Sequence, residues 1–161
     1  MREMDEYGLK LCRYQAELFE ESVGSTECSS KIFLRRFMLS DAARRMDADG
    51  FLLGAIDKAV VLDEIERQFG QSDYGKVKFS TEEMYWIGYI YRYWAYTKQK
   101  SSIQVYRIIK PDELRHLYYP YHSLDPGQTI ERIIEQKNMG EEDEIHRGVE
   151  ILKRVRAKRR Q

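Results

Sequence analysis

The stretch from Phe79 to Lys100, FSTEEMYWIGYIYRYWAYTKQK, constrains the fold of this chain more than any other part. Ser80, followed three residues later by Glu83, has the pattern of a helix-capping box. At about 100° per residue, apolar and aromatic side chains then cover most of the circumference of the helix. A helix of this kind is normally buried, so we expect residues 81–99 to form the central helix of the protein.

Apolar periodicity and turn signals predict further helices around this central one, over residues 3–23, 31–47, 56–69, 112–119, 126–138 and 141–158. Residues 51–55 and 103–109 each fit either a strand or a helix, and the helical context favours a helix for 103–109, with Ser102 as its cap. Pro120 and Gly140 are expected to end helices, and Asp125-Pro126 to start one. The prediction is a mainly α fold, a single compact domain of six or seven helices around residues 81–99.

The chain shows no internal repeat and no break in composition that would split it into separate folds. We expect residues 1–140 to form a helical core domain. Residues 141–161 are expected to form an amphipathic helix with a basic end, docked on the same domain or on a partner. Its apolar stripe is narrow and consists of Ile145, Val149, Leu152 and Val155.

The overall charge gives no reason to expect binding to nucleic acid or to anionic lipid, because 27 basic residues balance 27 acidic ones. Two local exceptions leave nucleic-acid binding open. One is the basic end of the chain, with Lys153, Arg154, Arg156, Lys158, Arg159 and Arg160. The other is the basic side of residues 31–47, where nearby aspartates favour a solvated face instead.

The sequence predicts a soluble cytoplasmic protein. No apolar signal segment is visible at the N-terminus, and the most apolar run, 84–96, is shorter than the ~20 residues that a membrane helix needs. Two cysteines are too few for a disulfide framework and match no zinc spacing, so Cys12 is expected to be a small core residue.

Motifs for catalysis are absent from the sequence: it contains no phosphate-binding glycine series and no metal-binding motif. We therefore predict no catalytic residue, no metal and no cofactor. His122 is the best candidate for a general base, with Asp125 near it in sequence. The alternative that we favour is that this histidine bonds a backbone carbonyl or Asp125 and fixes a turn.

The 12 tyrosines are the most unusual feature of the composition, and tyrosine is frequent at interfaces as well as in cores. One side of the central helix carries a polar aromatic patch, and the segment after it adds more tyrosines. The predicted partner-binding residues are Tyr85, Tyr89, Arg92, Tyr96, Tyr118 and Tyr121. The alternative is that these rings pack under the C-terminal helices as part of the core.

Three segments resemble small bacterial antitoxins of toxin–antitoxin pairs: KIFLRRFMLSDAARRMD, MYWIGYIYRYW and LRHLYYPYHSLDPGQTIERII. The resemblance implies a cytosolic, non-enzymatic protein whose partner is a cognate toxin, which it silences by direct contact. The chain departs from many antitoxins because it has no evident DNA-binding module. Two alternatives stay open: a nucleic-acid-associated regulator that uses the basic C-terminal helix, and a small enzyme that uses His122.

Overall fold

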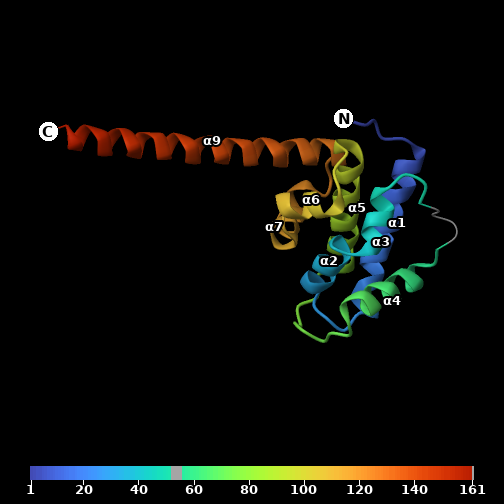
Figure 1. Ribbon diagram of the computed structural model, residues 1–161. Helices are drawn as coiled ribbons and strands as arrows, with labels where there is room; N and C mark the ends of the chain where they lie inside the picture. The colour runs from blue at the N-terminus through green and yellow to red at the C-terminus, as the bar shows by residue number, and fades with distance from the viewer. Residues whose placement is uncertain (52–55, 161) are drawn as a thin grey trace. The chain divides into compact units, whose positions relative to one another are not determined.

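The computed structural model describes residues 1–51 and 56–160, which are mainly helical (Figure 1). These described residues form nine helices and no strand, which confirms the predicted mainly α class. The chain divides into two units, Met1–Leu124 and Asp125–Gln161. The first unit holds helices α1 to α8, and the second is formed by α9.

Helix α5, Thr81–Lys98, is the central helix of the first unit, as predicted. The capping box is present: the Ser80 hydroxyl accepts from the N–H of Glu83, and the Glu83 carboxylate accepts from the N–H of Ser80. Gln99 ends the helix in the left-handed conformation, with φ 52°. Side chains from most of its circumference are buried: Met84, Trp86, Ile87, Ile90, Tyr91 and Trp94.

Helix α1, Glu6–Ser25, packs along α5 more extensively than any other pair of helices in the described residues (Figure 1). The two helices are antiparallel, since Gly8 lies beside Tyr96 and Gln15 lies beside Gly88. A Cβ added at Gly88 would lie 2.9 Å from the backbone oxygen of Gln15 and 3.0 Å from the Cα of Ala16. Only glycine at this position lets the two helices approach so closely.

We expect Gly88→Ala to lower the free energy of unfolding by about 1–3 kcal/mol. The added methyl group would clash with backbone atoms of α1, which cannot move away by a change of side-chain rotamer. Gly24→Ala is the matched control, since Gly24 lies in α1 and no atom comes within 4 Å of its added Cβ. The measurement is the urea midpoint of the two variants. Equal losses in both would contradict the close approach at Gly88.

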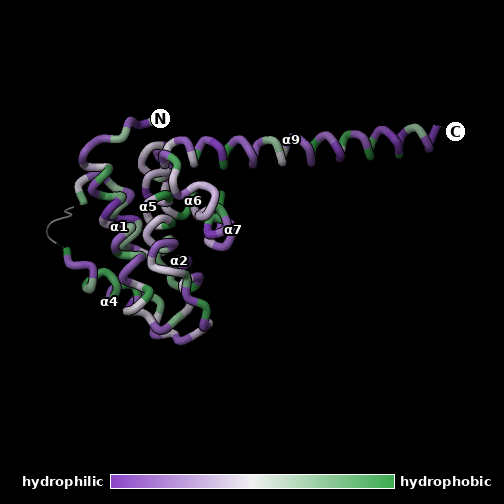
Figure 2. Tube along the Cα trace, turned by 180° about the vertical axis from the view of Figure 1, so that it is seen from behind, coloured by the Kyte–Doolittle hydropathy of each residue, from purple (hydrophilic) through white to green (hydrophobic). Residues whose placement is uncertain are grey.

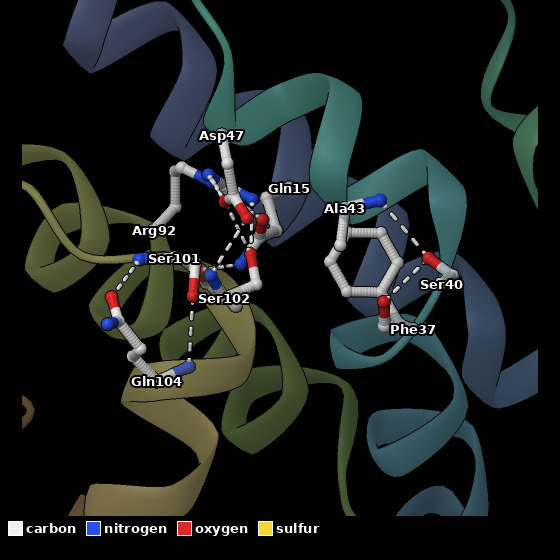
Figure 3. Close-up of polar contacts among 10 residues, drawn as sticks. Gln15, Phe37, Ser40, Ala43, Asp47, Arg92, Ser101, Ser102 and Gln104 are labelled. Atoms are coloured by element: carbon white, nitrogen blue, oxygen red, sulfur yellow. Dashed lines mark hydrogen bonds and ion pairs between the residues drawn. The ribbon is translucent and has the colours of Figure 1, made fainter.

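The single helix expected over residues 31–47 is two helices, α2 (Ser30–Met38) and α3 (Asp41–Asp47). The break falls at Ser40, whose hydroxyl donates to the carbonyl of Phe37 at 2.6 Å and accepts from the N–H of Ala43 at 3.1 Å (Figure 3). A serine that bonds the backbone on both sides ends one helix and caps the next. Apolar periodicity alone does not reveal such a break.

Helix α4, Lys58–Phe69, agrees with the helix expected over 56–69. Asp57 caps its start, and Gly70 ends it with φ 84°. Of the ambiguous run 51–55, residues 52–55 lie outside the described residues, and Phe51 is buried without regular structure.

The ambiguous run 103–109 is helical, as the context favoured, and forms α6 (Ser102–Ile108). Its cap is Ser101 and not Ser102 as predicted. Ser101 and Gln104 form a second capping box, in which each side chain accepts from the other residue's backbone N–H (Figure 3). Ser102 points instead into the interior, where it is 1% exposed.

The helix expected over 112–119 is divided into α7 (Pro111–His116) and α8 (Tyr118–Tyr121). Pro120 does not end this segment, contrary to the prediction, but lies in the first turn of α8. The backbone N–H groups of a first turn have no partner within the helix, so a proline sacrifices no hydrogen bond there.

The second unit is one helix, α9 (Pro126–Arg159). It starts as predicted, with Pro126 in its first turn and the Asp125 carboxylate accepting from the N–H of Gln128 at 3.1 Å. It does not break at Gly140, so the expected boundary between residues 140 and 141 falls inside α9. One glycine costs a helix interior only about 1 kcal/mol, and the flanking glutamates, lysines and arginines are good helix formers.

Candidate functional site

Arg92, expected on an exposed polar patch, is a buried residue that is 2% exposed. Its guanidinium donates to Oε1 of Gln15 at 2.8 Å, to Oδ1 of Asp47 at 2.7 Å and to Oγ of Ser102 at 3.0 Å (Figure 3). Asp47 also accepts from the hydroxyl and the backbone N–H of Ser102. These bonds tie α1, α3, α5 and α6 together, so Arg92 is not accessible to a partner, contrary to the expectation.

Tyr96 is also buried, at 7% exposed, and it fixes the N-terminal segment. Its hydroxyl donates to Oδ1 of Asp5 at 2.7 Å, and the guanidinium of Arg2 lies 4.1 Å from the centre of its ring. Burial and the bond to Asp5 raise the pKa of Tyr96 to about 12. Asp5 also caps α1, so Tyr96 connects the end of α5 to the start of α1.

The two remaining predicted residues of α5 form a ladder with a third tyrosine. The rings of Tyr85 and Tyr89 stack at 6.5 Å, and those of Tyr89 and Tyr93 at 6.3 Å. All three are half-buried, and we call them the tyrosine ladder. Sequence reasoning did not include Tyr93 in the patch, although its spacing of four residues from Tyr89 was a signal for it.

Charged residues of α1 lie close enough to act on the tyrosine ladder. Burial raises the pKa of Tyr85, and the negative charges of Glu17 and Glu20 raise it further, while Arg13 lowers it. Burial likewise raises the pKa of Tyr89. All three charged residues are exposed, so a partially exposed aromatic strip lies next to an exposed row of mixed charge. Aromatic rings beside charged groups that can make polar contacts are typical of protein-binding surfaces.

Tyr118 and Tyr121 lie in α8 and are half-buried. The rings of Tyr118 and Trp86 lie edge to face with their centres 5.8 Å apart, and the Tyr118 ring stacks on the imidazole of His122 at 4.6 Å. His122 is exposed, and its Nδ1 lies 2.9 Å from the carbonyl oxygen of Tyr118. The histidine therefore bonds the backbone of its own turn, which confirms the interpretation that it fixes this turn.

Ion pairs offset part of the positive charge in a pocket of the first unit and on the basic side of α2 and α3. A pocket of about 310 Å³ is lined by the arginines Arg2 and Arg92, but these are paired with Asp49 and Asp47. On α2 and α3, three basic side chains form ion pairs with acidic residues, and these are Lys31, Arg44 and Arg45. Asp41, the partner of Arg44, is one of the nearby aspartates that were expected to offset this charge.

Cys12 is fully buried, which confirms that it is a core residue. Burial raises the pKa of its thiol to about 12, so the reactive thiolate is scarce at neutral pH. Within residues 1–51 and 56–160, no cluster of three histidines, cysteines or carboxylates could hold a metal ion.

No helix in the described part of the chain has the length and apolar character to span a membrane. The tyrosine ladder is the candidate site, because its three rings are partly exposed, whereas Arg92 and Tyr96 are buried and bonded within the fold. In comparison with known proteins, no family model, curated protein or solved structure matches this chain.

Proposed function

We propose that this protein is an antitoxin-type binding protein that neutralises a cognate toxin by direct contact through the tyrosine ladder. The observation that carries the proposal is the accessible stack of Tyr85, Tyr89 and Tyr93 on the central helix. Tyrosine rings supply large contact areas and lose little conformational freedom on binding. The resemblance of three segments to bacterial antitoxins supplies the class of partner.

A rigid scaffold supports this surface. The backbone under the ladder belongs to α5, which α1 holds at a close approach through Gly88, and the bond from the Gln15 side chain to the Gly88 carbonyl is 3.0 Å long. A partner that binds the ladder would therefore meet preformed rings and would not have to order a loop. Preorganisation of this kind favours affinity because little entropy is lost on association.

The nucleic-acid alternative receives less support from α9. At about 100° per residue, the basic residues at its C-terminal end are spread over several sides of the helix. A binder of the phosphate backbone would be expected to gather them on one face. The His122 alternative also has less support, because the ring stacks on Tyr118 and its Nδ1 bonds a backbone carbonyl.

The test begins with the gene beside the one that encodes this protein. Its product should arrest growth when expressed alone and should be tolerated when this protein is co-expressed. The two proteins should also co-purify. A neighbouring product that is harmless, or one that is toxic but neither bound nor rescued, would contradict the proposal.

Tyr89→Ala should weaken the complex by about 2–4 kcal/mol, a loss of roughly 30- to 1000-fold in affinity, because Tyr89 is the central ring of the ladder. The measurement is the dissociation constant by calorimetry together with growth rescue. Tyr74→Ala is the matched control, since Tyr74 is exposed in the loop between α4 and α5. Full binding by both Tyr89→Ala and Tyr85→Ala would mean that the toxin binds elsewhere.

A further inference from the structure

The C-terminal half of α9 carries an apolar stripe that the described structure leaves exposed. Figure 2 shows hydrophobic positions recurring among hydrophilic ones along this helix. Ile145 is 68% exposed, Val149 43%, Leu152 58% and Val155 44%. Four large apolar side chains along one side of an exposed helix indicate a surface that is covered by a partner.

The stripe extends in both directions in the pattern of a coiled-coil seam. Residues 142, 145, 149, 152, 156 and 159 follow the alternating three- and four-residue spacing of such a seam. Apolar residues occupy the second, third and fourth positions and Arg156 the fifth, and Val155 flanks the seam beside Arg156. The two ends of the seam carry opposite charges, with Glu142 at one end and Arg159 at the other.

This order of charges selects the direction in which a second copy could pair. In a parallel pair, identical positions face each other, so Glu142 would face Glu142 and Arg159 would face Arg159. In an antiparallel pair centred between residues 150 and 151, Val149 faces the partner's Leu152, and Glu142 faces the partner's Arg159. The remaining layer places Ile145 against the aliphatic stem of the partner's Arg156.

The charged residues that flank the seam have the same order, acidic at its first end and basic at its last. Asp143 and Glu144 lie near its first end, and Lys158 and Arg160 near its last. An antiparallel pair brings each acidic end beside a basic end, whereas a parallel pair brings like charges together. Like charges in close contact oppose association, so charge complementarity favours a second copy of this chain in the antiparallel direction.

We propose that the segment 142–159 of α9 is a homodimerisation helix that pairs antiparallel with the same segment of a second copy. The contact is isologous, because the same surface is used by both chains and a two-fold axis passes through its centre. It is also short, with two central apolar layers, so the dimer is weak and forms as the protein concentration rises. This proposal does not depend on toxin binding through α5.

The first experiment is sedimentation equilibrium of the full-length protein over a hundredfold range of concentration. The average mass should rise from the 19.3 kDa of one chain towards twice that value. Val149→Asp should hold the mass at that of one chain. Ile151→Asp, the matched control, introduces the same charge two residues away but off the seam, and it should dimerise like wild type.

A charge exchange tests the direction of pairing. Glu142→Arg alone and Arg159→Glu alone should each weaken the dimer at least tenfold, since each places like charges in the end layers. The two substitutions combined in one chain should restore dimerisation, because the antiparallel pairs reform with their signs exchanged. A parallel pair would gain nothing from the combination.

Three results would overturn the proposal. The first is a wild-type protein that keeps the mass of one chain at every concentration, which would leave the stripe to a different partner. The second is equal loss of dimerisation in Val149→Asp and Ile151→Asp. The third is a combined charge exchange that dimerises no better than its single variants. All these positions are exposed, so circular dichroism should show an unchanged helix content in each variant.

Discussion

Arg92→Ala should lower the free energy of unfolding by about 3–5 kcal/mol, the usual cost of removing one partner from a buried ion pair. The Arg92 side chain is 2% exposed and that of Asp47 is 14% exposed, and their closest atoms lie 2.7 Å apart. Without the guanidinium, a largely buried carboxylate loses its counter-charge, and the side-chain oxygen of Gln15 loses its donor. The measurement is the free energy of unfolding from urea titration.

Two further variants make this prediction specific. Arg13→Ala removes an exposed arginine from the neighbouring helix α1 and should change stability by no more than about 0.5 kcal/mol. Adding Asp47→Asn to Arg92→Ala should cost less than the sum of the two single variants, because the second substitution removes the charge that the first leaves unpaired. Equal midpoints for Arg92→Ala and Arg13→Ala would contradict the structural role of Arg92.

Trp94→Ala is expected to lower the free energy of unfolding by about 3–5 kcal/mol, because it would empty a buried aromatic site in the central helix. Trp94 is 1% exposed and is the largest of the fully buried side chains in the described residues. The helices packed around α5 can close only part of the space that the indole leaves. The measurement is again the urea midpoint, and an unchanged midpoint would show that α5 is not the core.

Trp94→Phe separates the loss of volume from the loss of polar contacts. Among the described residues, the indole N–H of Trp94 has no hydrogen-bond partner, so no bond is lost when phenylalanine replaces it. We expect a loss below about 1.5 kcal/mol, since the phenyl ring keeps most of the buried surface. A loss equal to that of Trp94→Ala would indicate that the indole N–H makes a contact on which stability depends.

Local signals in the sequence were sufficient to place most helix starts. The capping box of Ser80 and Glu83 and the Asp125-Pro126 start are both present, because a cap is a bond between residues three positions apart. The incorrectly predicted helix boundaries depend on local backbone effects that hydrophobic periodicity does not measure. Ser40 divides a continuous apolar pattern by bonding the backbone on both sides, while Gly140 fails to break α9.

The candidate site was only partly predictable. The sequence placed Tyr85, Tyr89, Arg92 and Tyr96 on one side of α5, and it determined this angular position through the period of the helix. It did not determine which part of that side another helix covers. The residues that bond Arg92 are 77, 45 and 10 positions away along the chain, so no short-range pattern connects them.

The sequence by itself therefore determined the helical class, the central position of α5 and the order of charges along α9, since each depends on the spacing of neighbouring residues. Only the tertiary structure decided that Arg92 and Tyr96 belong to the interior and that the tyrosine ladder remains accessible. The physical reason is that burial and pairing of a side chain depend on which distant segment packs against it. That choice is made by the packing of the whole unit, in which α1 approaches α5 at Gly88.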